Sequence, residues 1–206
     1  VTFGGSGLDR AAAMRAQADE LKVQAGARSV LLWRGKPMIS GDDLLRVPID
    51  HPVMADASAD LILLGREDAA PIFAANLSAW EPADFGTETL DSFLDPSEQK
   101  HPVLPGAVFA ELRAVMTRLS PRDAVLAATA RAVMEWHRTL RFCARCGAES
   151  AMAMAGWQRD CAACGAHHFP RTDPVVIMLI THGNAVLVGR SPGWPDGMYS
   201  LLAGFV

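Results

Sequence analysis

The sequence predicts a mixed α+β protein that contains a small metal-stabilised module. Short apolar, β-branched runs bounded by turn residues predict paired strands within residues 29–77. A long segment with helical periodicity follows Ser120, and two Cys-x-x-Cys pairs come directly after it. A further pair of apolar runs occupies residues 175–190. Strands that are separated in this way from a run of helix are typical of α+β folds.

Length and charge limit the classes of function that the chain can have. Its 206 residues suffice for one large or two small domains, to which the cysteine module adds another. The formal net charge of -4 argues against a general binder of nucleic acid or anionic membranes, which needs a positive surface. A small anionic ligand in a local basic site remains compatible with this charge.

The sequence also predicts a cytoplasmic protein with no membrane partner. The longest uninterrupted apolar run, residues 175–180, has six residues, whereas a bilayer span needs roughly 18. Residues 1–10 are rich in glycine and lack the charged and then apolar pattern of a signal peptide. Cysteines arranged as metal ligands favour a reducing compartment as well.

The N-terminal part of the chain predicts one helix and two hairpins. Ala11 to Leu21 is rich in alanine and predicts a short surface helix with Asp9 as its N-cap. Residues 29–39 and 60–77 each contain two apolar pieces around a turn, so each predicts a β-hairpin. The second turn is expected at Glu67 to Ala69. Together these elements predict a small α+β domain.

A linker and two helices are expected next. Prolines and polar residues mark residues 95–102 as the linker, and a helix is predicted over about Ala107 to Leu119. The second helix has a clear start signal, with Ser120 as N-cap and Pro121 at the first helical position. Asp123 stands where the acid of a capping box reaches back to the N-cap.

One face of this second helix is apolar at helical spacing up to about residue 140. Such a stripe most often packs into a core, here on the sheet and the preceding helix, and a contact between subunits is the alternative. Three arginines near the cysteine module could complement an anionic substrate, although a solvated face is the more common role. The stripe consists of Val125, Ala128, Ala132, Val133, Trp136 and Leu140, and the arginines are Arg131, Arg138 and Arg141.

The four cysteines of the chain form two matched pairs that predict a structural zinc site. Two residues between cysteines let a tight turn direct both sulfurs at one ion, and two such turns complete a tetrahedral four-thiolate shell. Two disulfides or a redox Cys-x-x-Cys are the alternatives. Disulfides are disfavoured because nothing suggests secretion, and a redox motif needs a single pair. The predicted ligands are Cys143, Cys146, Cys161 and Cys164, with His167 and His168 as further candidates.

Strands are expected again after the cysteine module. Two apolar runs, residues 175–180 and 185–190, flank a turn at His182 to Asn184, so they predict a hairpin with both faces largely covered. The Pro- and Gly-rich residues 191–197 predict a loop. Met198 to Phe205 predicts a further strand.

From the cysteines onward, the order of motifs resembles the NADH pyrophosphatase family of Nudix hydrolases. After the double Cys-x-x-Cys come Phe-Pro-Arg-Thr-Asp-Pro-Val-Val-Ile, Gly-Met-Tyr-Ser and Leu-Ala-Gly-Phe-Val, all within the last third of the chain. The upstream half fits the family's variable N-terminal domain only loosely. The resemblance implies an N-terminal Nudix-like domain (1–100), a helical linker (101–141), a zinc ribbon (142–169) and the first strands of a Nudix α/β/α sandwich (170–206).

The resemblance also implies an activity and several site residues. Members hydrolyse the pyrophosphate of NADH, NAD⁺ or the NAD cap of an RNA to nicotinamide mononucleotide and AMP, as homodimers that use Mg²⁺ or Mn²⁺. Phe169 would contact the dinucleotide, Phe205 would stack on a substrate base, and the backbone carbonyl of Ala203 would bind the catalytic divalent ion. Gly204 would open the Nudix box. The catalytic glutamates are then expected beyond Val206, and the 206-residue chain alone is expected to be inactive.

Two other functions stay open at this point. A non-catalytic zinc-ribbon scaffold that binds a nucleotide or a protein would end at Val206. A Nudix enzyme for another nucleoside diphosphate derivative is the second alternative, although the zinc ribbon joined to Phe-Pro-Arg-Thr-Asp-Pro favours the NADH branch. Two departures from the family affect substrate contacts. Phe169 stands where some members have tyrosine, and Gly156 precedes Trp157 where some have glutamate.

Overall fold

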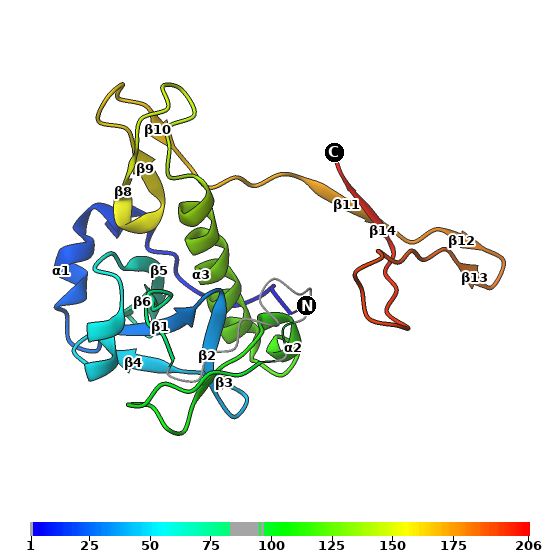
Figure 1. Cartoon of the computed structure of the whole chain (residues 1–206), viewed down its shortest axis with the longest axis horizontal. Helices are drawn as coiled ribbons and strands as arrows, with labels where there is room; N and C mark the ends of the chain where they lie inside the picture. Colours follow the sequence, from blue (N-terminus) through cyan, green and yellow to red (C-terminus); the bar gives the residue numbers. More distant parts are fainter. Residues whose placement is uncertain (1, 83–94, 96) are drawn as a thin grey trace. The chain divides into compact units, whose positions relative to one another are not determined.

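The computed structural model describes residues 2–82, 95 and 97–206, and it divides into two compact units. The first holds the described residues up to 170, and the second holds residues 171–206 (Figure 1). The expected α+β class is confirmed. Residue 96 of the predicted linker lies outside the described residues. No helix in the described ranges combines the length and apolarity that crossing a membrane requires.

The first unit contains short 3-10 helices (η), α-helices and two sheets. Its elements are η1 (Ala12–Gln17), α1 (Ala18–Lys22), β1 (Arg28–Trp33), β2 (Lys36–Ser40), β3 (Asp43–Leu44), β4 (Arg46–Pro48), η2 (Pro52–Asp56), β5 (Ile62–Glu67), β6 (Ala70–Asn76), β7 (Val108–Phe109), α2 (Leu112–Val115), α3 (Pro121–Thr139), β8 (Ala151–Ala153), η3 (Met154–Gly156), β9 (Gln158–Asp160) and β10 (His167–His168).

The main sheet has the strand order β3-β2-β1-β6-β5, with β4 also paired to β1 and β7 to β2. Both predicted hairpins are confirmed, because β1 pairs with β2 and β5 with β6 in antiparallel register. The first turn has positive φ at Arg34 (48°) and Gly35 (80°), and the second at Asp68 (47°) and Ala69 (71°). Two consecutive residues of this kind match the right-handed twist of the flanking strands. Strands β1 and β6 pair in parallel.

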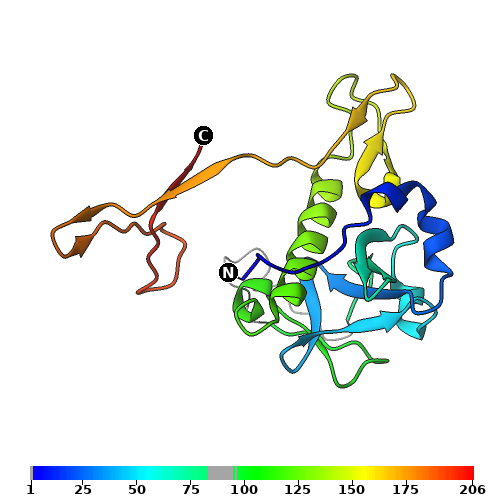
Figure 2. The same ribbon diagram turned by 180° about the vertical axis from the view of Figure 1, so that it is seen from behind.

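Both faces of this sheet are buried. Along β6, Ile72 and Ala74 belong to one hydrophobic cluster, and the alternate residues Phe73 and Ala75 belong to another. Helices α2 and α3 cover the first face, and α1 and η2 contribute to the second (Figures 1 and 2). Burial on both faces explains why the strand sequences are nearly continuous apolar runs.

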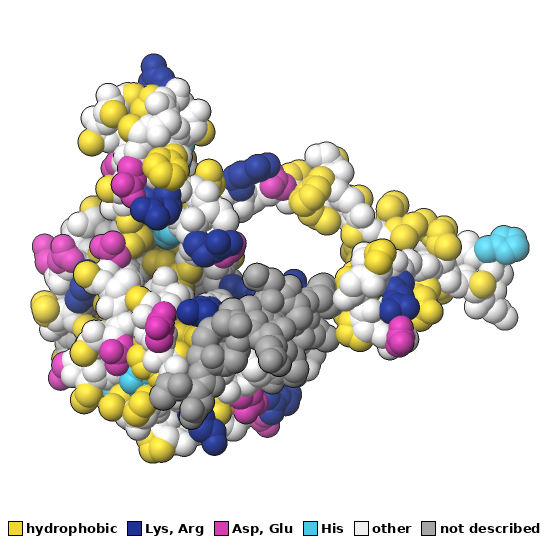
Figure 3. All heavy atoms as spheres, viewed as in Figure 1, with side chains coloured by type: hydrophobic (Ala, Val, Ile, Leu, Met, Phe, Trp, Pro, Cys, Tyr) yellow, Lys and Arg dark blue, Asp and Glu magenta, His cyan; other side chains and the backbone are white. Residues whose placement is uncertain are grey.

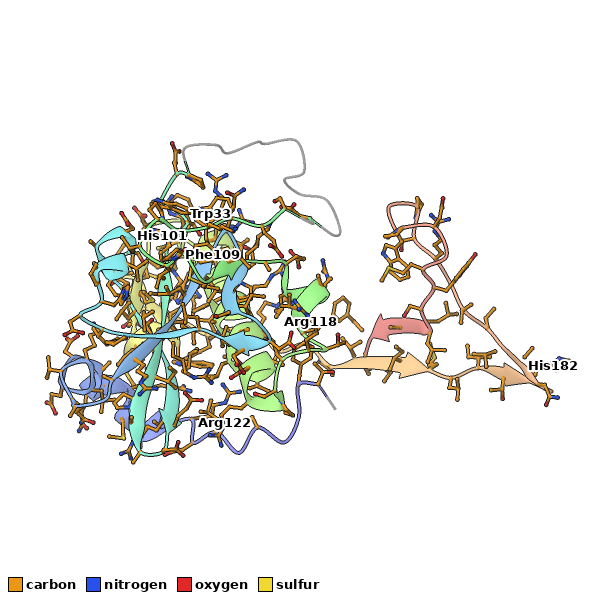
Figure 4. All side chains as sticks on the ribbon, turned by 90° about the horizontal axis from the view of Figure 1, so that it is seen from below. Trp33, His101, Phe109, Arg118, Arg122 and His182 are labelled. Carbon is orange, nitrogen blue, oxygen red and sulfur yellow. The ribbon has the colours of Figure 1, made fainter. Side chains whose placement is uncertain are left out.

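An aromatic cluster closes the second face of the sheet. The ring centroids of Trp33 and Phe109, both labelled in Figure 4, lie 6.2 Å apart. Those of Trp80 and His101 lie 4.5 Å apart. The indole Nε1 of Trp33 donates to the Trp80 carbonyl at 2.8 Å. On the outside of the cluster, His101 Nε2 lies 3.1 Å from a carboxylate oxygen of Asp56. The indole N–H of Trp33 and the ring of His101 therefore have hydrogen-bond partners.

The long helix α3 begins as the sequence predicts, but its first turn does not form a capping box. The hydroxyl of Ser120 accepts from the backbone N–H of Asp123 at 3.1 Å. The Asp123 carboxylate does not reach back. It accepts from the backbone N–H of Leu44 at 3.3 Å and pairs with Arg46 at 2.5 Å. Arg46 also pairs with Glu67 at 2.6 Å, so one guanidinium joins β4, β5 and α3.

The buried face of α3 is rotated from the predicted stripe. Of the predicted residues, Val125, Val133 and Trp136 are buried, Ala128 and Leu140 are half-buried and Ala132 is exposed. The face of α3 that packs on the sheet also includes small and branched side chains that are adjacent in sequence to the predicted ones. The buried residues of α3 are Asp123, Ala124, Val125, Leu126, Ala127, Ala130, Val133 and Trp136.

Two other predicted helices are wrong in part. Within Ala107 to Leu119, β7 forms first and pairs with β2, with Phe109 opposite Met38, so only the short α2 remains helical. The buried Phe109 is the reason, since it fills the second face of the sheet. The predicted helix at Ala11 to Leu21 is a 3-10 turn followed by the short α1.

Asp9 fixes the N-terminal segment to the main sheet. Its side chain accepts from the backbone N–H of Ala11 at 2.9 Å, as a capping residue does, although Ala11 has a left-handed φ of 48°. The backbone carbonyl of Asp9 accepts from the N–H of Arg66 at 2.8 Å. This bridge to β5 replaces a regular helix start.

The second unit consists of short antiparallel pairs. Its strands are β11 (Val175–Met178), β12 (Thr181–His182), β13 (Ala185–Val186) and β14 (Leu202–Phe205). β12 and β13 form the predicted tight turn, with Gly183 at φ 58°, whereas β11 pairs with β14. The expected strand from Met198 is shorter, since β14 begins at Leu202. The expected coverage of both faces is wrong, because every residue of β11 and β14 is exposed.

Candidate metal centre

Two matched turns hold the four cysteines. In the first, the N–H of Gly147 donates to the Cys143 carbonyl at 2.9 Å, and in the second the N–H of Gly165 donates to the Cys161 carbonyl at 2.8 Å. Both glycines have positive φ, 77° and 68°, a conformation that glycine adopts without steric cost. The sequence repeat Cys-x-x-Cys-Gly therefore corresponds to a repeated local structure.

The four sulfur atoms lie at the spacing of a tetrahedral zinc site. All lie within 4.8 Å of one another. The Cys143 and Cys164 sulfurs are 3.6 Å apart, and those of Cys146 and Cys161 are 3.5 Å apart. A zinc–sulfur distance of about 2.3 Å implies sulfur separations of about 3.8 Å in a tetrahedron. A disulfide needs about 2.05 Å, so these cysteines form none.

The pKa values of two of the four thiols are shifted in opposite directions. Burial raises the pKa of the Cys143 thiol, but hydrogen bonds from His168 and two backbone N–H groups outweigh it and bring this pKa to about 6. A backbone hydrogen bond at Ala148 lowers the pKa of Cys146, but the neighbouring thiols outweigh it and raise this pKa to about 12. A bound cation favours the thiolate form of its cysteine ligands, because its charge offsets theirs.

The two candidate histidines lie outside the four-sulfur cluster. Nε2 of His168 is 3.2 Å from the Cys143 sulfur, a distance suited to an N–H that donates to a thiolate. Nδ1 of His167 lies 2.7 Å from a carboxylate oxygen of Asp160. A closed shell of four sulfurs leaves no position for water, so zinc bound there has a structural role.

Several contacts attach the cysteine module to the rest of the first unit. The indole Nε1 of Trp157 donates to the Leu63 carbonyl at 2.7 Å, and the Arg15 guanidinium lies 4.1 Å from the centroid of the same indole. Nε2 of His137, on α3, lies 2.8 Å from the Gly156 carbonyl. The contacts of Arg15 and His137 with the ribbon were not predicted from the sequence. The Gly156-Trp157 dipeptide between the cysteine pairs was a signal that could have indicated a close contact there.

The predicted substrate contacts lie in different units. Phe169 follows β10 and is 61% exposed in the first unit. Ala203 and Phe205 lie two residues apart on β14 and so share a face, opposite Ile177 and Val175 of β11. Phe205 is 80% exposed. The structure thus brings the four cysteines together and places Ala203 beside Phe205, while Phe169 belongs to the cysteine module.

These observations define a class of protein: a zinc-ribbon protein with an N-terminal α+β domain attached to the ribbon. Residues 26–136 match the family model of the NADH pyrophosphatase-like rudimentary NUDIX domain, and residues 138–169 match that of the NADH pyrophosphatase zinc ribbon domain. The first match alone covers more than half of the chain. The chain belongs to the NADH pyrophosphatase family of Nudix hydrolases.

Curated relatives carry names from the same family. The chain is 38% identical over 132 residues to the mitochondrial NAD(P)H pyrophosphatase NUDT13 of Homo sapiens, covering 62% of this chain and 36% of the relative. It is 33% identical over 143 residues to the NAD-capped RNA hydrolase NudC of Stutzerimonas stutzeri, covering 69% and 44%. It is 30% identical over 209 residues to NudC of Mycobacterium bovis, covering 97% and 60%. The chain thus spans between about a third and three fifths of these relatives.

Proposed function

We propose that this chain is part of an enzyme that hydrolyses the pyrophosphate of NAD(H) to nicotinamide mononucleotide and AMP. The observation that carries the proposal is the tandem match of residues 26–136 and 138–169 to two NADH pyrophosphatase domain models. The relatives' names, NAD(P)H pyrophosphatase and NAD-capped RNA hydrolase, support it. Free NADH, NAD⁺ and an NAD-capped RNA offer the same pyrophosphate, so all three are proposed substrates.

We assign the proposed scaffold and hydrolase roles to separate domains of the chain. The N-terminal domain (1–100), the helical linker (101–141) and the zinc ribbon (142–169) form the scaffold, with Cys143, Cys146, Cys161 and Cys164 as zinc ligands. Residues 170–206 begin the Nudix hydrolase domain. The contacts of Trp157 and His137 support a scaffold role for the ribbon, since they fix it to β5 and α3.

The proposed substrate contacts are two aromatic rings and one carbonyl. The exposed rings of Phe169 and Phe205 suit the flat faces of nicotinamide and adenine. The backbone oxygen of Ala203 is a hard donor of the kind that Mg²⁺ and Mn²⁺ prefer. When bound, such an ion stabilises the negative charge that develops when water attacks one phosphorus.

Three further features belong to the proposal. A homodimeric assembly and a requirement for carboxylates in addition to Ala203 follow from the family resemblance, and a cytoplasmic location follows from cysteines arranged as metal ligands. Among the described residues, the group suited to hold a metal ion is the cysteine cluster. The 206 residues by themselves are therefore expected to leave NADH intact.

A substrate panel tests the proposed function. The protein from its native source is assayed with NADH, ADP-ribose and diadenosine polyphosphates in Mg²⁺, and products are separated by chromatography. We expect NADH to be hydrolysed fastest, to nicotinamide mononucleotide and AMP, while the 206-residue chain serves as an inactive control. Faster turnover of ADP-ribose would assign another Nudix substrate, and nucleotide binding without turnover would support the non-catalytic scaffold.

A further inference from the structure

A cavity of about 300 Å³ lies between α3, the edge of the main sheet and the zinc ribbon. Its volume is at the lower end of the range typical of small-molecule sites. All residues that line it belong to the first unit, between Ser58 and Arg159. In the space-filling view, dark blue and cyan side chains gather in a hollow beneath the ribbon (Figure 3).

Arg159 is a buried cation on the wall of this cavity. The residue is 7% exposed, and no ion pair found in the described part of the chain includes it. Its guanidinium instead donates to the Ser150 hydroxyl and carbonyl, to the Arg141 carbonyl and to Nδ1 of His137. Burial lowers the pKa of Arg159 and the charge of Arg141 lowers it further, whereas the carboxylate of Glu149 opposes both.

One N–H group of Arg159 is left over. A guanidinium has five N–H groups. The group on Nε and both groups on Nη2 have acceptors, and one of the two on Nη1 donates to His137 at 3.1 Å. The remaining N–H of Nη1 has no acceptor among the described residues. A buried cation with a spare donor beside a cavity is suited to an anionic ligand.

Other donors line the same cavity. The side-chain oxygen of Asn76 already accepts from the N–H and the hydroxyl of Ser78, at 2.9 and 2.6 Å, whereas its NH₂ group has no acceptor among the described residues. Arg141 uses Nη2 for an exposed ion pair with Glu149 at 2.8 Å. Exposed pairs of this kind are weak because water screens both charges, so Arg141 can turn to a ligand at little cost.

The cationic groups of the lining outnumber the acidic ones. Three arginines line the cavity together with His137, and the acidic side chain among the lining residues is the exposed Asp60. Guanidinium groups bind phosphate oxygens with two parallel hydrogen bonds and retain their charge at every physiological pH. The arginines are Arg138, Arg141 and Arg159.

Apolar side chains line the cavity among the arginines, since Met152 is the cross-strand neighbour of Arg159. Met134 of α3 and Met152 of β8 line the cavity and are partly buried against the core of the first unit. A bare inorganic ion would leave these side chains in contact with water. A phosphate that carries an organic group would cover them as well as satisfy the donors.

We propose that this cavity binds the phosphate group of a small phosphomonoester, with Arg141, Arg159 and Asn76 as donors and Met134 and Met152 against its organic part. Every residue of this site precedes the segment in which the Nudix hydrolysis is proposed. Binding at this site therefore does not depend on the proposed function. It can be measured in the zinc-loaded 206-residue chain without any hydrolysis.

Calorimetric titration with AMP tests the site. We expect AMP to bind with a dissociation constant in the micromolar to millimolar range, and adenosine, which lacks the phosphate, not to bind. Arg141→Gln removes one donor, and Ser58→Glu places a carboxylate in the lining, so each should weaken AMP binding at least tenfold. Arg118→Gln is the matched control, since Arg118 forms an exposed pair with Asp42 at 3.0 Å and does not line the cavity.

Each outcome decides the proposal. Equal binding of AMP and inorganic phosphate would support the phosphate site and remove the contribution of the two methionines. Absence of AMP binding to the zinc-loaded chain, equal binding of adenosine, or the same loss in Arg118→Gln would overturn it. Circular dichroism of every variant excludes unfolding, and Ser58→Glu keeps the test valid if Arg141→Gln fails to fold. A failed substrate panel with intact AMP binding would affect the proposed function alone.

Discussion

His137 shows how contacts select a single protonation state. A carbonyl can only accept, so Nε2 of His137 must carry the proton that the Gly156 carbonyl accepts at 2.8 Å. A guanidinium can only donate, so Nδ1 must be the acceptor for Arg159 at 3.1 Å. A second proton would place two cations against each other. Burial, followed by the charge of Arg159, lowers the pKa of His137, although the Gly156 carbonyl opposes this.

Stability should therefore fall in mild acid. The pKa of His137 in the folded state lies below its ordinary value of 6.5, so the unfolded state binds the proton more readily. The contribution of neutral His137 is complete above about pH 6.5 and is lost as pH falls through the folded-state pKa. We expect a lower thermal midpoint at pH 5.5 than at pH 7.5, and a smaller difference in His137→Gln, which cannot titrate.

The test of this pH dependence also requires unchanged charges around His137 and a control at a second histidine. Arg138 at the end of α3, Arg141 just beyond it, Arg159 of β9 and Asp60 line the same cavity, and none of them is changed in the variant. His182→Gln alters an exposed histidine of the second unit and should keep the pH dependence of the original chain. An unchanged slope in His137→Gln would show that other groups cause it.

Single residues were predictable where their chemistry is local in sequence. Four cysteines at matched spacing define their own ligand geometry, so Cys143 and its partners could be identified before any fold was known. Arg159 and His137 could not, because their roles depend on a contact between residues 22 apart, on different elements. Nothing in the spacing of a single histidine and a single arginine predicts that contact.

Among the elements, β5 carries an irregularity with a clear steric cause. The register of β5 against β6 shifts between Leu63 and Gly65, which marks a β-bulge. Gly65 has a φ of 149°, and a Cβ there would lie 2.2 Å from the backbone oxygen of Asp9. The bulge thus makes room for the N-terminal segment beside the strand.

Replacing this glycine should destabilise the first unit. Gly65→Ala combines a disfavoured φ with a backbone clash, and we expect a loss of about 1–3 kcal/mol in the free energy of unfolding, measured in urea. Gly106→Ala is the control, because no heavy atom lies within 4 Å of the added methyl group and its φ is ordinary. Equal stability of the two variants would mean that the Asp9 segment moves away at little cost.

Elements were predictable from sequence where a turn or cap is encoded by adjacent residues. Both N-terminal hairpins and the start of α3 at Ser120 depend on such local signals. The segment around Phe109 was predicted as helix, because its partner strand β2 lies about 70 residues earlier in the chain. Helix propensity is weak compared with the burial of such a ring against the second face of the sheet.

At the scale of the whole molecule, the zinc ribbon and the main sheet form one energetic unit. In the ribbon, the indole of Trp157 donates to the Leu63 carbonyl of the sheet, and the Gly156 carbonyl accepts from His137 of α3. Met152 and Trp157 also pack against the hydrophobic cluster that α3 shares with the sheet. Loss of the metal should consequently destabilise the sheet as well as the ribbon.

Removal of one thiolate tests this coupling. Cys143→Ser should lose bound zinc and lower the thermal midpoint by more than about 5 °C, since 1 kcal/mol corresponds to about 2–4 °C in a chain of this size. Metal content by mass spectrometry and scanning calorimetry give the two readouts. Ala144→Ser, in the same turn but without loss of a sulfur, is the control. Zinc loss with an unchanged midpoint would show that sheet and ribbon are independent.

The architecture of the whole molecule was predictable as far as its fold class, α+β. The α+β architecture followed from composition and periodicity, and the resemblance named the family that the domain models show. The exposed strands of the second unit differ from expectation, because an apolar run predicts burial without naming the element that buries it. The parallel pairing of β1 with β6 was likewise invisible, since no local signal marks it.

The order of the strands also governs when the protein can fold during its synthesis. β1 is synthesised before its partners, since its parallel neighbour β6 ends at Asn76 and the strand β7 that pairs with β2 ends at Phe109. The cluster on the first face needs side chains as far along the chain as Trp136. Closing such long loops is slow, because chain entropy must be overcome before the contacts form. The nascent sheet should therefore keep its first face uncovered until α3 has emerged.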